Sequence, residues 1–207
     1  MGLDTVEGLR SFCLELSNDR PSPGGGTASA AAGAMAASLL VMVCAITARS
    51  KKHASSVSEL TRLHEVLETE RDGLIRLALW DARAYDSLME AVRKARAEQG
   101  SKVAFKEMDE ALRRAAEVPL DTAAACLRVL EYAEKVAELG TRSASSDVGV
   151  AVLLAEAGLN GASKNVMINL KEINDIGYVD NLAGKLRLWE TEARKLADNT
   201  LARLEKP

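Results

Sequence analysis

Apolar side chains recur every three or four positions along most of the 207-residue chain, and this spacing is typical of amphipathic helices. The longest such pattern covers residues 55–99, where one face is rich in leucine and the other is charged. Similar patterns predict helices over residues 4–17, 102–117, 120–139 and 178–204. No alternating strand pattern of useful length is present, so the sequence predicts an all-α fold.

Two further segments, residues 27–52 and 148–162, are small and apolar on all sides. A helix without a polar face lies either in a protein core or in lipid. The first segment has nearly the length of a membrane span, but its first half is alanine, glycine and serine, and no other segment resembles a span. A buried central helix is therefore favoured, with close contact to its neighbours through Gly26, Ala30 and Ala34.

Two places interrupt these patterns. Val118 and Pro119 predict a kink or a break, because proline cannot donate the backbone hydrogen bond that a helix needs. Residues 165–174 are less regular than their surroundings. The whole chain, residues 1–207, is predicted to form a single domain, a bundle of about six helices around the small-residue helix.

Composition narrows the function classes. Aromatic residues make up only 3% of the chain and the formal charge is −3, so no basic stripe for nucleic acid is expected. Cys13, Cys44 and Cys126 are far apart, without the paired spacing of a zinc site or a disulfide framework. His53 and His64 would lie about 16 Å apart along one helix, so no metal site is predicted. With no apolar signal core near Met1, a cytoplasmic protein without membrane attachment is expected.

The sequence PSPGGGTASAAAG, at residues 21–33, leads into the predicted central helix. A Walker loop would require a lysine after the glycines, and a dinucleotide fingerprint would require a preceding strand and a glycine in place of Ser29. At minimum, the glycines permit a tight turn into a crowded helix. They also expose backbone N–H groups at a helix N-terminus, where a flat or anionic ligand can approach.

Asp81 falls on the inward stripe that starts from Leu60 and Leu63, where a charge is costly unless it is paired. One interpretation places it at the edge of the stripe, paired with Arg83 or Lys51. The other makes it a functional carboxylate whose pKa is tuned by its surroundings.

Other polar candidates also have structural interpretations. Asp147 stands at the start of an apolar helix, where a negative charge interacts favourably with the helix dipole. Lys51 and Lys52 stand at the end of another predicted helix, where positive charges are favourable for the same reason. Asn165 and Asn169 are four residues apart and would share a helical face. Their amides would either cap a helix or form a turn, or they would bind a ligand with several heteroatoms.

Several blocks together resemble the formiminotransferase-cyclodeaminase C-terminal family, which includes stand-alone bacterial methenyltetrahydrofolate cyclohydrolases. The similarity begins at PSPGGGTASAAAGAMAASLLVMV and AITARSKK, and it continues at WDARAYDSLMEA, AAEVPLDTA, SSDVGVAVLLAEAGLNGA and NVMINL. The chain departs from the pattern at Thr27, where serine is usual, and around Lys51 and Lys52, where a preceding glycine and a following aromatic residue are missing.

The resemblance implies an all-helical homodimer with a folate site near the dimer interface. It implies hydrolysis of 5,10-methenyltetrahydrofolate to 10-formyltetrahydrofolate, or the cyclisation of 5-formiminotetrahydrofolate with release of ammonia. No cofactor is implied beyond the tetrahydrofolate substrate. A non-enzymatic helical assembly protein is the alternative of another class.

On this resemblance, Asp81 is the expected catalytic carboxylate and Asp147 a second one. The remaining expected site residues bind the substrate through the glycine turn, a basic pair for the glutamate tail, and two amides for the pterin edge: Ser22, Pro23, Gly24, Gly25, Gly26, Lys51, Lys52, Asn165 and Asn169.

Overall fold

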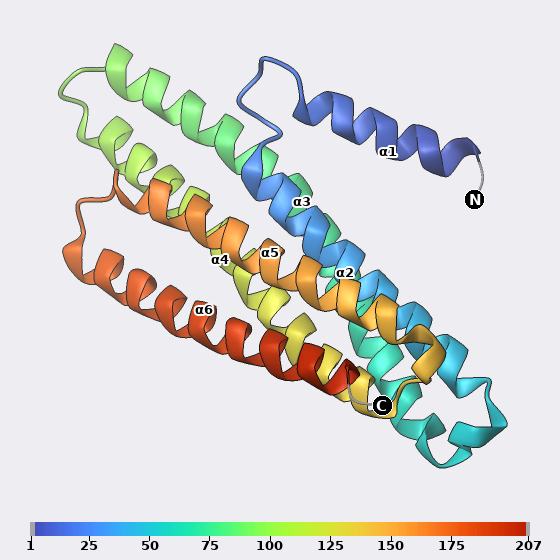
Figure 1. The fold of residues 1–207 in the computed structure, drawn as a ribbon. Helices are drawn as coiled ribbons and strands as arrows, with labels where there is room; N and C mark the ends of the chain where they lie inside the picture. Colours follow the sequence, from blue (N-terminus) through green and yellow to red (C-terminus); the bar gives the residue numbers. More distant parts are fainter. Residues whose placement is uncertain (1–2, 206–207) are drawn as a thin grey trace.

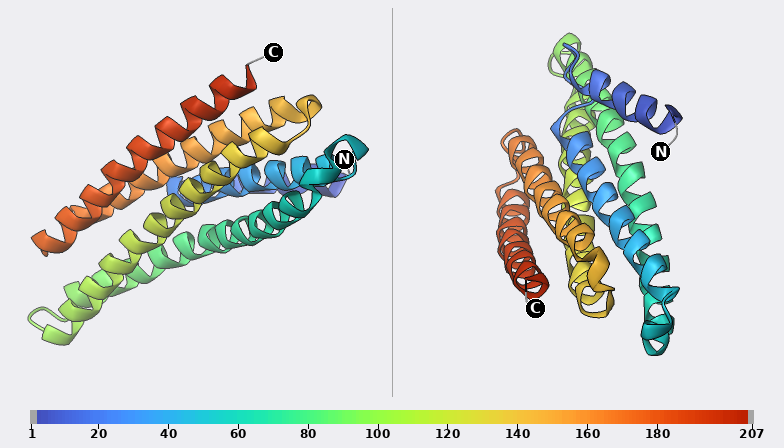
Figure 2. Two further views of the ribbon diagram at one scale, coloured as in Figure 1. Left: turned by 90° about the horizontal axis from the view of Figure 1, so that it is seen from below. Right: turned by 45° about the vertical axis from the view of Figure 1, so that its right-hand side comes forward.

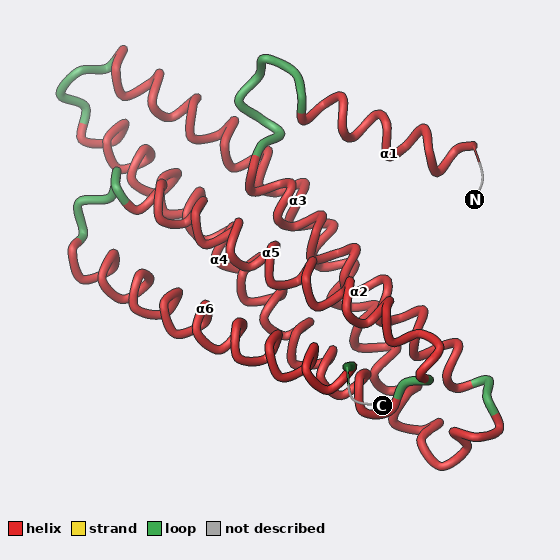
Figure 3. Tube along the Cα trace, viewed as in Figure 1, coloured by secondary structure: helices red, strands yellow, loops and turns green. Residues whose placement is uncertain are grey.

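The structure is a computed structural model that describes residues 3–205 (Figure 1). Over these residues the chain is helical with short connections and no strand (Figure 3), which confirms the all-α prediction. The α-helices are α1 (Leu3–Leu16), α2 (Gly25–Ala48), α3 (Val57–Ala97), α4 (Lys102–Leu139), α5 (Ser145–Leu170) and α6 (Ile176–Leu204). Two short 3-10 segments, η1 (Lys51–Ser56) and η2 (Arg142–Ala144), precede α3 and α5.

Helices α2, α3, α4 and α5 form a four-helix bundle, in which α2 packs mainly against α3 and α5 and also contacts α4. Consecutive helices run in opposite directions, as Figure 1 shows, and α6 covers the side formed by α4 and α5 (Figure 2). The N-terminus of α2 therefore lies beside the middle of α3 and α4 and the C-terminal end of α5.

The small residues of α2 allow it to occupy the centre of the bundle. Ala30, Ala36 and Ala37 are fully buried, and a Cβ on Gly33 would lie 2.6 Å from the sulfur of Cys126. Helix α2 is long and apolar enough to cross a membrane by length and composition alone, but half of its most apolar stretch is buried against other helices. Its burial between α3, α4 and α5 favours the prediction of a buried central helix.

A kink or a break was predicted at Pro119, and the break does not occur, because α4 continues through it as one helix of 38 residues. Proline has no N–H, so it cannot bond to the carbonyl of Ala115 one turn earlier. In the structure this carbonyl accepts a hydrogen bond from the Asn169 side chain at 2.5 Å instead. The lost bond is thus replaced by one from α5, and the helix is maintained.

The irregular segment predicted at residues 165–174 is also mostly helical, since α5 extends to Leu170. At the other end of the chain, α1 forms as predicted but stands apart from the bundle (Figure 2). Val6 and Leu9, on its apolar face, are about half exposed. Within one chain this face has no core to join.

Candidate functional site

A cavity of about 360 Å³ opens where the N-terminus of α2 meets α3, α4 and the end of α5. The glycine turn forms one wall, and Asp81 of α3 and two asparagines of α5 contribute polar groups to the others. Its lining residues are Pro21, Ser22, Gly24, Gly25, Gly26, Asp81, Ala84, Tyr85, Leu88, Met89, Ala115, Asn165, Ile168, Asn169 and Glu172. Residues separated by more than 140 positions in sequence thus meet in one place.

Asp81 lies directly against the glycine turn. A Cβ on Gly26 would come within 2.7 Å of Asp81 Oδ2 and closer still to Oδ1, nearer than Cβ atoms approach in proteins. Only glycine therefore allows this carboxylate to approach the backbone so closely. The hydroxyl of Thr27 donates a hydrogen bond to Asp81 Oδ2 at 2.9 Å.

This contact also completes the start of α2. Gly24, the N-cap residue, has no side chain to accept a hydrogen bond from the free N–H groups of the first turn. Asp81 brings a carboxylate from α3 to this end of the helix, where the Thr27 hydroxyl bonds to it. A negative group at a helix N-terminus is also favoured by the helix dipole.

Burial raises the pKa of the Asp81 carboxyl above its ordinary value of 3.8, while the hydrogen bonds from the Thr27 hydroxyl and backbone amide act in the opposite direction. Neither Arg83 nor Lys51 forms an ion pair with Asp81 among the residues 3–205. The interpretation of Asp81 as one half of a surface ion pair is therefore wrong. A half-buried carboxylate without a cationic partner is a candidate for proton transfer.

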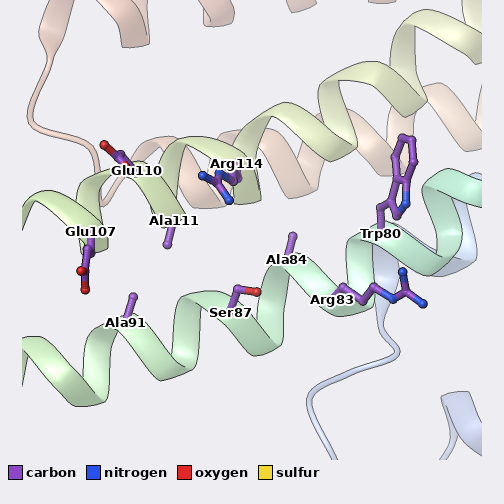
Figure 4. Close-up of a pocket in the computed structure, with 9 residues that line it drawn as sticks. All are labelled: Trp80, Arg83, Ala84, Ser87, Ala91, Glu107, Glu110, Ala111 and Arg114. Carbon is purple, nitrogen blue, oxygen red and sulfur yellow. The ribbon is translucent and has the colours of Figure 1, made fainter. Parts of the chain in front are cut away.

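Arg83 lies outside this cavity, in a separate hollow of about 370 Å³ between α3 and α4. Figure 4 shows Arg83 and Trp80 on α3 and Arg114 on α4 at this second hollow. Only Ala84 lines both cavities. The position of Arg83 explains why it does not neutralise Asp81.

Asn165 and Asn169 share one face of α5, and both side chains are oriented by hydrogen bonds. The amide of Asn165 donates to the carbonyl of Gly161 at 2.9 Å, and that of Asn169 donates to Ala115. Each amide uses one of its two N–H groups in this way, so it keeps a second N–H as a donor and its oxygen as an acceptor. The cavity can therefore bind a ligand that presents both N–H donors and acceptor atoms.

Two polar residues of the cavity, Tyr85 and Glu172, were missed by the sequence reasoning. Glu172 follows Asn165 by seven residues and Asn169 by three, the spacing of one helical face, and this periodicity was a readable signal. Tyr85 stands four residues after Asp81 on α3, also on the same face.

Several expected site residues do not reach this cavity within one chain. Lys51 and Lys52 follow the C-terminal end of α2, whose 24 residues at ~1.5 Å each separate them from Gly25 by about 36 Å. Asp147 lies in the first turn of α5, about 27 Å along the helix axis from Asn165. These three residues would join the site only if a second copy of the chain brought them there.

The turn before α2 divides its residues between two surfaces. Ser22 and Gly24 line the cavity, whereas Pro23 lines a groove on the other side, next to α1. Within residues 3–205, no group of three or more His, Cys, Asp or Glu side chains is arranged to hold a metal ion. The polar side chains that line the cavity are two carboxylates, two amides and two hydroxyls, from Asp81, Glu172, Asn165, Asn169, Ser22 and Tyr85.

The chain is similar in sequence to known proteins. The sequence model of the family described as formiminotransferase-cyclodeaminase matches residues 8–187. The chain is 36% identical to a methenyltetrahydrofolate cyclohydrolase of Methylorubrum extorquens, over 94% of this chain and 93% of that protein. It is 32% identical to the mouse formimidoyltransferase-cyclodeaminase, over 98% of this chain but 37% of the mouse protein.

A solved structure has the same fold. The crystal structure of a formiminotetrahydrofolate cyclodeaminase from Thermotoga maritima superposes with a TM-score of 0.87, at 31% identity and with 95% of each chain covered. The family match, over residues 8–187, spans the glycine turn, Asp81 and both asparagines. The chain belongs to the formiminotransferase-cyclodeaminase family.

Proposed function

We propose that this protein hydrolyses 5,10-methenyltetrahydrofolate to 10-formyltetrahydrofolate. The observation that carries the proposal is the half-buried Asp81 carboxylate, held against the glycine turn in a cavity with no cationic side chain among its lining residues. Support also comes from the Methylorubrum relative, which matches this chain over nearly its full length and is named as this enzyme.

The charge of the cavity suits the substrate. Methenyltetrahydrofolate carries a positive charge spread over its reacting carbon and the two nitrogens beside it. Asp81 and Glu172 are the acidic residues of the cavity, and a carboxylate near the cationic carbon stabilises it and activates water. The oxygens of Asn165 and Asn169 would accept hydrogen bonds from the N–H groups of the pterin.

In the proposed reaction, Asp81 removes a proton from water as the water oxygen bonds to the methenyl carbon. The bond between that carbon and N5 of the folate then breaks, N5 takes the proton from Asp81, and the hydroxyl proton of the adduct passes to solvent. The sum is one cation and one water giving 10-formyltetrahydrofolate and one proton. Asp81 is base and then acid, and ends in its starting form, so the proposed step uses only water and this carboxylate.

The test is a rate measurement with methenyltetrahydrofolate, following loss of its conjugated absorbance above the buffer-catalysed rate. Wild-type protein should accelerate the loss, and Asp81→Asn should lower kcat by about 100-fold or more. Asp86→Asn is the matched control, because Asp86 is exposed on the same helix. Absence of acceleration by the wild type would contradict the proposal and favour a non-enzymatic assembly protein.

The second candidate reaction is cyclisation of 5-formiminotetrahydrofolate with release of ammonia. It is supported by the Thermotoga structure, which carries the name of a cyclodeaminase. The reaction involves the same one-carbon unit attached at N5, so one cavity can accommodate both substrates. Ammonia release measured against methenyl hydrolysis, with the same Asp81→Asn variant, would distinguish the two activities.

We also propose that the protein acts as a cytoplasmic homodimer. Its support is a groove of about 820 Å³ between α1 and the exposed face of α2 and α3, with apolar side chains along it. The exposed large apolar residues on these three helices are Val6, Leu9, Leu14, Met35, Met42, Ile46, Val57, Ile75, Leu79 and Trp80. A second copy would cover this face and give α1 a surface to pack on.

A further inference from the structure

The Thr27 side chain links the start of α2 to one turn of α3. It is only 6% exposed, and its hydroxyl lies 2.9 Å from Asp81 Oδ2 and 3.4 Å from the carbonyl oxygen of Ala78. A hydroxyl has one proton to donate, and the shorter contact to a charged acceptor is the stronger one. The hydrogen bond of Thr27 therefore goes to the carboxylate.

We propose that Thr27 is a positioning residue that differentiates the two oxygens of Asp81. Its hydroxyl binds Oδ2, and Oδ1, which lies over the bare backbone of Gly26, is left as the oxygen that exchanges the proton with water and with N5. This inference rests on the proposed function, since it assigns the geometry by which Asp81 acts as base and acid.

Positioning is needed because a carboxylate on a single rotatable side chain would otherwise turn either oxygen toward the substrate. The bond to Thr27 fixes the plane of the carboxylate, and the absent Cβ of Gly26 leaves space for the second oxygen. The bond also stabilises the ionised form of Asp81 against burial, so water meets a base rather than a neutral acid.

The other titratable groups that face Asp81 across the cavity are few. Tyr85 comes from α3 and Glu172 follows α5, while the described parts of α2 and α4 contribute no charged side chain to the lining. Glu172 is an acid, so it offers no positive charge that would stabilise ionised Asp81. The stabilisation of ionised Asp81 thus depends on Thr27.

The test compares Thr27→Val, which keeps the shape and removes the hydroxyl, with Thr27→Ser, which keeps the hydroxyl. The valine variant is expected to lose about tenfold or more in kcat with little change in KM, and the rising limb of its pH profile should move to higher pH. The serine variant should restore most of kcat and the wild-type limb. An unchanged profile in Thr27→Val, or equal loss in both variants, would overturn the proposal.

A second measurement does not require turnover. The pKa of Asp81, followed by NMR of its carboxyl carbon in wild type and both variants, should rise in Thr27→Val and stay near wild type in Thr27→Ser. If Thr27→Val does not fold, as judged by circular dichroism, Thr27→Ala replaces it against the same serine variant. An inactive wild type with the expected pKa pattern would contradict the proposed function alone, whereas an active wild type without that pattern would contradict the role of Thr27.

Discussion

The backbone of Gly26 and the carboxylate of Asp81 are in direct contact, and no side chain larger than hydrogen fits between them. An alanine at position 26 would place a methyl group within 2.7 Å of Asp81 Oδ2. Asp81 would have to turn away from Thr27 and out of its position in the cavity. Gly26→Ala is therefore expected to reduce methenyltetrahydrofolate hydrolysis by about 100-fold, because moving a catalytic group by about 1 Å can lower the rate by that factor.

Gly149→Ala is the matched control for this prediction. Gly149 is also helical, but a Cβ there would make only ordinary contacts, at 3.8 Å from Leu201 and Leu204. Activity should stay unchanged, and the free energy of unfolding should rise by about 0.5–1 kcal/mol, as replacing a helical glycine with alanine usually does. Full activity in Gly26→Ala would show that the position of Asp81 does not matter for the reaction.

A second prediction concerns the amide that replaces the hydrogen bond lost at Pro119. Asn169→Ala would leave the buried Ala115 carbonyl without a donor, at a cost of about 1–3 kcal/mol in the free energy of unfolding. Asn165→Ala should cost less, because its partner Gly161 lies within the regular part of α5. Urea denaturation of both variants checks this difference, and equal losses would contradict the role assigned to Asn169.

Much of the fold could be predicted because the spacing of apolar residues within one helix indicates which of its faces is buried. The stripe from Leu60 to Leu77 is buried as the spacing indicated, and the small-residue segment is the central helix. The same stripe pointed to Asp81 as an inward carboxylate. The proximity of Asp81 to the glycine turn was expected from the family resemblance, and the structure brings the two together.

The errors came from relationships between helices. The break predicted at Pro119 did not occur, because the donor that replaces its missing N–H belongs to α5 and lies 50 residues later in the chain. Lys51, Lys52 and Asp147 were predicted to share a site with the glycine turn, and long helices separate them from it within one chain, so this prediction depends on a second copy of the chain. The lengths of α2 and α5, and so these separations, were readable from the sequence, whereas the directions of neighbouring helices were not.

A third prediction follows from the raised pKa of Asp81. The folded state binds the Asp81 proton more tightly than the unfolded state, whose carboxyl has its ordinary pKa. This contribution to stability is complete at pH values below the ordinary pKa and is lost as pH rises through the folded-state pKa. Ionised Asp81 at neutral pH therefore destabilises the fold, and a neutral side chain should relieve the effect.

Asp81→Asn is accordingly expected to raise the thermal midpoint at neutral pH, although it lowers kcat by about 100-fold or more. The difference from wild type should shrink as the pH falls toward 3.8, where the carboxyl becomes protonated in both states. Differential scanning calorimetry across pH checks the trend, with the exposed Asp86→Asn as control. A stability difference that does not change with pH would contradict the assigned effect of burial.

The last prediction tests the homodimer at the groove between α1, α2 and α3. Leu79 lines this groove and is 58% exposed, and Ile75 one turn earlier is exposed on the same face. Leu188 on α6 is 72% exposed and lies outside the groove. Leu79 therefore tests the proposed interface, and Leu188 is a control because it is exposed outside it.

Light scattering after size exclusion should give the wild type twice its chain mass of 22.1 kDa. Leu79→Glu places a charge in a contact that must exclude water, so it should shift the mass toward that of a single chain. Leu188→Glu should leave the dimer intact. A wild type with the mass of one chain would contradict the homodimer, and a dimeric Leu79→Glu would place the interface on another face. If Asp147, Lys51 and Lys52 contribute to the cavity from a second copy, the monomeric variant should also lose activity while remaining folded.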